Sequence, residues 1–232
     1  MPDQPRFLLV VSHQMENTPA FDRAAALAKA SSAALHIVAF DYLEGLASAG
    51  MANDEAREQM RVDYIERHRQ WLESQARPLR KIGIPVTTEV VWVERPLQEI
   101  LIHIKEQPMA LLIKALEHES LLSRLMFTPL DLHLLRECPV PLHFVSHVQH
   151  DLPRRIVAAV DPFHRDGQYK NFNDRILHEA AKLASTCNAE LDVIYAHDLS
   201  SISADEFGFD NASAFFSSNK ATTLFDAQAD AF

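Results

Sequence analysis

The sequence predicts an α/β fold, in which an open parallel sheet flanked by helices is followed by a partial second copy of the same domain. Three observations predict it. Short, almost wholly apolar runs read as strands buried on both faces. Over residues 6–146 these runs alternate with longer amphipathic segments, which favours parallel pairing through right-handed crossovers. The pattern of the first strand, first helix and second strand then recurs after residue 154.

Five strands and four helices are expected in the first copy. The expected strands are residues 6–12, 34–40, 84–93, 109–113 and 141–145. The expected helices are residues 20–31, 54–81, a short segment opening at Pro96, and 128–137. Proline at the start of a helix is harmless because the first N–H groups have no helical partner, whereas Pro78 should kink or end the long second helix.

Apolar residues at helical spacing fall near one face of each later helix, and those of the helix that opens at Pro96 are expected to point inward. They are Met60, Tyr64, Trp71 and Leu72 in the long helix, Ile100, Leu101 and Ile104 in the next, and Leu130, Leu134 and Leu135 in the last.

The repeat sets the expected domain boundaries. Residues 155–161 (RIVAAVD) restate residues 6–12 (RFLLVVS), and residues 182–195 restate residues 26–39. We therefore expect a first domain over residues 1–147, a linker over 148–153 and an incomplete second domain over 154–232. The missing strands would leave an apolar sheet edge open. The hypothesis is therefore that the sequence is a truncated copy of a longer chain.

Composition excludes several function classes. The net charge of −10 disfavours binding to nucleic acid or to an anionic membrane, because both are negatively charged. No apolar run approaches the ~20 residues that cross a bilayer, and because residues 1–6 lack a charged-then-apolar pattern we expect no signal segment there. With only Cys138 and Cys187, a disulfide scaffold is not expected, and a reducing cytoplasm fits best.

Residues 110–145 run from an apolar strand through a loop and a helix to a Cys-Pro-x-Pro turn and a last strand. This segment resembles the C-terminal half of a universal stress protein domain. The string FTPLDLHLLRECP at residues 127–139 and the tandem copies resemble the tandem-domain subtype of that family. The resemblance implies strand order 3-2-1-4-5 and a cytoplasmic, non-enzymatic stress-response role. It also implies a dimer or pseudo-dimer through the fifth strand, here Val140 to Val145.

In nucleotide-binding members of the family, a Gly-x-x-Gly-x9-Gly-Ser/Thr loop holds the phosphates. Aligned on this sequence, its glycine positions fall on Ala115, His118 and Thr128, and its hydroxyl position on Pro129. Side chains there block the close approach of backbone N–H groups to an anion, and proline has no N–H to offer. The first domain is therefore expected not to bind ATP in the usual way.

The family's pocket also uses an aspartate at the end of the first strand. Ser12 holds that place in the first copy and Asp161 in the second, so ATP is expected only through the incomplete second domain. The leading interpretation is a non-enzymatic tandem stress protein, without a cofactor, whose first domain is a structural or interaction half.

The alternative is a small-molecule or nucleotide site, with ATP hydrolysis as one form of it, in a pocket without glycines. Ligands of open α/β sheets bind beyond the carboxyl ends of the strands, at the switch point between strands one and four. Ser12, His13, Ala115 and His118 would line that crevice. We favour a crevice closed by its own side chains, because fold analogy alone is weak support for a pocket.

His143, His147 and His150 are closely spaced, but zinc needs three or four converging ligands and no Cys-x2–4-Cys pair accompanies them. They are expected to be unrelated, with no metal bound.

Asp131 and His133 lie two apart on a helix and point in different directions, so Asp131 is expected to favour the helix dipole rather than to catalyse. Glu99 and His103, four apart, are expected to form a surface pair.

Overall fold

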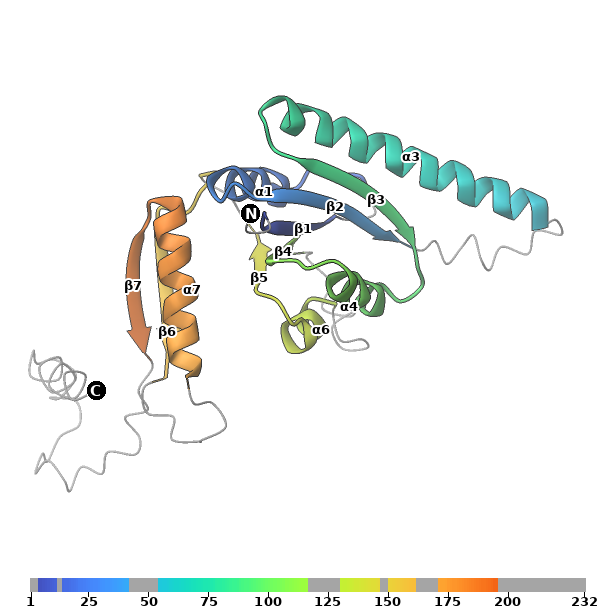
Figure 1. Ribbon diagram of the computed structural model, residues 1–232. Helices are drawn as coiled ribbons and strands as arrows, with labels where there is room; N and C mark the ends of the chain where they lie inside the picture. The colour runs from blue at the N-terminus through green and yellow to red at the C-terminus, as the bar shows by residue number, and fades with distance from the viewer. Residues whose placement is uncertain are drawn as a thin grey trace, which may run out of the picture. The chain divides into compact units, whose positions relative to one another are not determined.

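The computed structural model describes residues 4–11, 14–41, 54–116, 130–146, 150–161 and 171–195. A five-stranded sheet with the order β3-β2-β1-β4-β5 is its centre (Figure 1). The strands are β1 (Arg6–Val11), β2 (Ala34–Asp41), β3 (Val86–Trp92), β4 (Leu111–Ala115) and β5 (Leu142–Val145). All four neighbouring pairs in this sheet are parallel. The predicted fold class and strand order are confirmed.

The central strand β1 divides the core into two layers. Side chains alternate across a strand, so Phe7, Leu9 and Val11 pack against α1 (Pro19–Ala30) and α3 (Asp54–Lys81). Leu8 and Val10 pack on the opposite face against α4 (Pro96–Glu106) and α6 (Leu130–Glu137). Figure 1 shows these two pairs of helices on opposite faces of the sheet.

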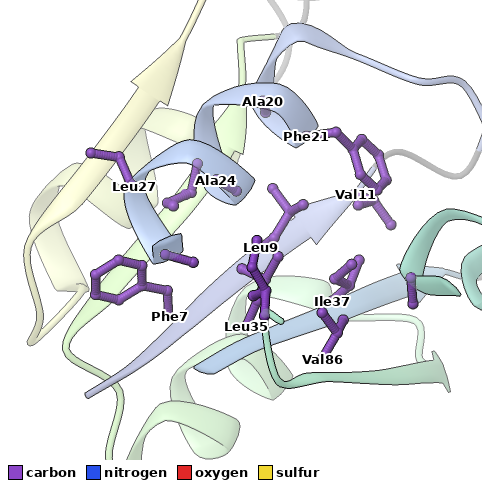
Figure 2. Packing of buried hydrophobic residues seen from close by; sticks show 14 of the residues in the cluster. Phe7, Leu9, Val11, Ala20, Phe21, Ala24, Leu27, Leu35, Ile37 and Val86 are labelled. Carbon is purple, nitrogen blue, oxygen red and sulfur yellow. The ribbon is translucent and has the colours of Figure 1, made fainter. Parts of the chain in front are cut away.

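Small side chains let α1 lie close to the sheet. Ala20, Ala24 and Ala28 recur every four residues and are fully buried above β1 and β2, as Figure 2 shows for the first two. Phe21 fills the remaining space and meets Trp71 of α3 edge to face, with ring centroids 5.7 Å apart. The two helices on this face are thus joined by an aromatic contact.

Several expected details are wrong. The long helix has the expected bounds, Asp54–Lys81, but Pro78 does not end it, since a proline in the last turn removes a single helical hydrogen bond near an end that is open in any case. Met60 and Leu135 were grouped with the apolar faces of their helices, but Met60 is 42% exposed and Leu135 is 60% exposed. In the short α6, the buried Leu134 and the partly buried Leu130 face the core, and Leu135 is rotated away from them. The expected helix start at Thr128 and Pro129 lies outside the described residues.

Strand boundaries shift by small amounts. β3 begins at Val86 and β4 occupies Leu111–Ala115. β5 begins at Leu142, whereas the strand was expected from Pro141 and its pairing segment from Val140. Val140 is partly buried and packs against the core layer between the sheet and the helices α4 and α6.

A second, two-stranded sheet consists of β6 (Arg155–Val160) and β7 (Glu190–Tyr195), with α7 (Phe172–Cys187) between them in the chain. This is the strand–helix–strand order that the repeat predicts. The domain boundaries at residues 147 and 154 stay a prediction. Among the described residues, no helix is long and apolar enough to cross a membrane.

The two-layer core predicts the cost of truncating β1. Leu9→Ala should lower the free energy of unfolding by about 2–5 kcal/mol, because Leu9 is fully buried and its removal leaves a cavity. Leu135→Ala, the same chemical change at an exposed site, should change it by less than about 0.5 kcal/mol. Urea unfolding followed by circular dichroism measures both. Equal costs would contradict the described packing.

Candidate functional site

Four residues were predicted to line a crevice at the carboxyl ends of β1 and β4, and one of them, Ala115, lies within the described residues. Ala115 is the last residue of β4, is half-buried and lies opposite Val145 of β5 in register. Ser12, His13 and His118 lie outside the described residues. Their role as pocket residues therefore stays a prediction.

Asp161, the expected nucleotide residue of the second copy, directly follows β6 and is exposed. Its backbone N–H donates to Asn173 Oδ1 at 3.1 Å, and Asn173 Nδ2 donates to the Asp161 carbonyl oxygen at 2.8 Å. The side chain of Asn173 thus fixes the main chain where β6 ends. A contact of Asp161 with a ligand stays a prediction.

A buried ion pair lies where β4 ends. Lys114 is 5% exposed, and its Nζ lies 3.1 Å from Asp131 Oδ1 in the first turn of α6. The same ammonium group donates to the Ala115 carbonyl oxygen at 3.1 Å. Asp131 therefore does more than complement the helix dipole, because it also neutralises a lysine at the carboxyl end of the sheet. Its neighbour His133 faces Glu137 instead, at 3.3 Å.

A second polar cluster joins α3 to the end of β2. The Tyr64 hydroxyl donates to Asp41 Oδ2, and His68 Nε2 lies 3.6 Å from the same oxygen. His68 Nδ1 donates to the Tyr64 carbonyl oxygen at 2.9 Å, because that oxygen can only accept. Burial and the bond to Asp41 raise the pKa of the Tyr64 hydroxyl, which keeps it a donor. The cluster holds the long helix on the sheet.

The third cluster lies nearer the amino ends of the strands, at the third residue of β2 and the middle of β3, between the sheet and α4. His36 of β2 and His103 of α4 are both buried, and their Nε2 atoms are 2.9 Å apart. Glu89 of β3 approaches both, with its Oε2 at 3.3 Å from His36 Nε2 and 3.6 Å from His103 Nε2. Two imidazoles and a carboxylate therefore converge on one point.

Neighbouring groups hold His36 in place. Its Nδ1 lies 2.7 Å from Thr87 Oγ1, and Arg6 donates to that same hydroxyl at 3.0 Å. Arg6 also donates to Gln107 Oε1 at 2.7 Å, just beyond α4. Burial first, and then the charges of Arg6 and His103, lower the pKa of His36 to about 4. His36 is therefore neutral near pH 7.

Sequence reasoning missed this third cluster and misplaced one of its members. His103 was expected on the surface with Glu99, whereas it is 6% exposed and faces β2 and β3. The available signal was a histidine three residues after the buried Ile100, on the apolar side of α4. His36 likewise interrupts an apolar strand. Neither signal shows that the two residues meet.

The three closely spaced histidines of the sequence, His143, His147 and His150, are not part of this cluster. His143 belongs to β5, and burial followed by the charge of Arg23 lowers its pKa to about 4. His150 is exposed, and His147 lies outside the described residues. That these three are unrelated to one another stays a prediction.

His36 predicts a loss of stability in acid. Its folded-state pKa lies below its ordinary value of 6.5, so the unfolded chain binds the extra proton as the pH falls from about 6.5 to 4. The free energy of unfolding should drop through that window, by at most about 1.4 kcal/mol per pH unit from this group. His36→Gln should remove this part of the slope and leave the part due to His143. Urea unfolding at several pH values measures it, and parallel curves for the two proteins would refute it.

The chain resembles known proteins in sequence. The model of the universal stress protein family matches residues 5–146. Universal stress protein E of Escherichia coli K12 is 24% identical over 196 residues, which cover 84% of this chain and 62% of that relative. The universal stress protein E homologue of Haemophilus influenzae is 28% identical over 144 residues, covering 60% of this chain and 45% of the relative. The chain thus spans less than two thirds of the length of these relatives.

Solved structures show the same fold. A functionally unknown protein from Pseudomonas aeruginosa PAO1 has a TM-score of 0.61 at 22% identity, covering 90% of this chain and 72% of that chain. A universal stress protein from Archaeoglobus fulgidus DSM 4304 has a TM-score of 0.61 at 16% identity, covering 88% and 72%. With the family model matching more than half of its length, this chain belongs to the universal stress protein family and resembles universal stress protein E.

Proposed function

We propose that this protein is a non-enzymatic, cytoplasmic stress-response protein of the tandem type, whose first domain is a structural and interaction half that does not bind ATP in the usual way. Membership of the universal stress protein family supports the stress-response role. Cys138 and Cys187 are both free thiols, which suits a reducing compartment. The observation that carries the proposal is the ion pair of Lys114 and Asp131 at the carboxyl end of β4.

This ion pair works against phosphate binding in two ways. Asp131 places a carboxylate in the first turn of α6, where the helix dipole would otherwise favour an anion. The same carboxylate neutralises Lys114, a cation at the end of β4 that could attract phosphate. A phosphate group would have to displace Asp131 from a buried pair, which is costly because the displaced charge loses its partner. The side chains at the family's glycine positions act in the same direction.

The contacts of Asp131 and His133 support a non-enzymatic role. The two residues have separate partners, Lys114 and Glu137, so they do not form an acid–base pair in the described structure. A catalytic histidine needs a partner that orients it toward a nucleophile or substrate. His133 instead forms a helix-surface pair of the ordinary (i, i+4) kind, worth a few tenths of a kcal/mol.

The interaction role is assigned to β5. This strand is the last of the sheet, next to β4, and its outer backbone groups face no strand within the described sheet. Exposed backbone groups of an edge strand can pair with a second chain. We therefore assign self-association to the segment from Val140 to Val145, of which Leu142–Val145 form the strand.

Titration of the full chain with MgATP by isothermal calorimetry tests the nucleotide part of this proposal. We expect no saturable heat at micromolar nucleotide. Asp131→Asn should bind ATP more tightly than the unchanged chain, because Lys114 loses the carboxylate that neutralises it. Stoichiometric micromolar binding that persists when Asp161→Ala removes the second domain's expected nucleotide residue would contradict the proposal. If that binding were lost in His13→Ala and His118→Ala, it would support the alternative pocket instead.

Sedimentation velocity over a range of protein concentrations tests self-association. We expect a concentration-dependent dimer. Leu135→Lys alters an exposed position of α6 and leaves the backbone edge of β5 intact, so this control should still form the dimer. A monomer at every concentration would contradict the role given to β5.

A further inference from the structure

The cluster at the amino ends of the strands is separate from the crevice where the family's nucleotide site would lie. His36 is the third residue of β2, and Glu89 the fourth of β3, whereas Lys114 and Ala115 end β4. His103 reaches the cluster from α4, beneath the sheet in Figure 1. Its chemistry therefore needs an explanation independent of the proposed function.

Three ligand atoms suited to a transition metal converge here. His36 Nε2, His103 Nε2 and a Glu89 carboxylate oxygen all lie within 4.8 Å of one another. Two histidines and one carboxylate form a ligand set that binds zinc with a fourth position left for water. We propose that His36, His103 and Glu89 bind a zinc ion at the amino end of the sheet.

The distances between the ligand atoms are close to those of a tetrahedral site. Zinc–ligand bonds of about 2.0–2.1 Å at tetrahedral angles separate the ligand atoms by about 3.3 Å. The two distances from Glu89 to the imidazoles are 3.3 and 3.6 Å. The two Nε2 atoms are closer, at 2.9 Å, which is a hydrogen-bond distance between imidazoles. Zinc binding therefore requires these nitrogens to separate by a few tenths of an ångström and the hydrogen bond between them to open.

The ring geometry shows what must move. The two imidazole planes are 5° apart and their centroids 5.1 Å apart, so with 2.9 Å between the Nε2 atoms the rings meet edge to edge. The two nitrogen lone pairs therefore face each other, and both rings must rotate to aim them at one point beside Glu89. Phe40 meets His103 edge to face, with centroids 5.7 Å apart, and limits how far that ring can turn.

A second shell suited to a metal ligand is already present at His36. Histidines that bind metals donate their other ring N–H to an oxygen acceptor, which fixes the tautomer and the ring orientation. Thr87 Oγ1 lies 2.7 Å from His36 Nδ1 and can accept that hydrogen bond while also accepting one from Arg6. With Nδ1 protonated, Nε2 offers its lone pair to the ion.

The ion has a path to this site. The side chain of Glu89 is 43% exposed, whereas both imidazoles are buried. Water and ions can therefore reach the carboxylate without unfolding the sheet. The guanidinium of Arg6 is held by Gln107 and Thr87.

Zinc titration of the full chain, stripped of metal with a chelator, tests the proposal. We expect one ion per chain with a dissociation constant below about 1 µM. His103→Gln and Glu89→Gln should each weaken binding by more than about tenfold, because loss of a second-shell partner alone costs about 10–100-fold. Cobalt bound in place of zinc should give the absorption of a four-coordinate ion, and this should be lost in the same variants.

His133→Gln is the matched control, because His133 also faces a glutamate but belongs to no three-ligand group among the described residues. It should bind zinc as the unchanged chain does. Glu89→Gln alters a partly exposed side chain, and circular dichroism will show that this variant is folded. Absence of stoichiometric binding, or binding unchanged in both His103→Gln and Glu89→Gln, would overturn the proposal.

Discussion

The rest of the structure depends on the burial of β1 on both of its faces. This strand pairs with β2 on one side and β4 on the other, and its alternate side chains supply both core layers. A strand in that position cannot carry an unpaired polar side chain without a large desolvation cost. Among the described residues, the polar clusters therefore involve β2, β3 and β4, toward one or the other end of the sheet, rather than the middle of β1.

The two ends differ in what their polar groups leave available. At the carboxyl end, Lys114 is paired with Asp131, and Asp41 is bonded to Tyr64 and lies near His68, so these charges stabilise the docking of helices. At the amino end, the nitrogens of His36 and His103 meet each other beside a partly exposed carboxylate. Ion pairs between opposite charges are already neutralised. Two facing imidazoles share one hydrogen bond and can exchange it for a cation.

Most of the fold could be predicted because it depends on local patterns. Continuous apolar runs such as that of β1 identify buried strands, and the start of α4 at Pro96 follows from proline chemistry. The errors arose where a local pattern fits more than one arrangement. Leu134 and Leu135 are both apolar, and only packing shows that Leu134 is buried while Leu135 is exposed.

The polar clusters could not be predicted because they depend on contacts between distant parts of the chain. His36, Glu89 and His103 come from two strands and a helix, and their meeting follows from the register of β2 against β3 and the position of α4. The partner of Lys114 is similarly set by where α6 begins relative to β4.

The central claim is that the two ends of the sheet have different roles, with a cation site at the amino end and no phosphate site at the carboxyl end of the first domain. A crystal structure of the chain grown with both zinc and MgATP, with anomalous data at the zinc edge, tests both parts together. We expect a zinc peak bonded to His36, His103 and Glu89, and no nucleotide beside Lys114 and Asp131. Nucleotide bound at the end of β4, with no zinc between the two imidazoles, would contradict it.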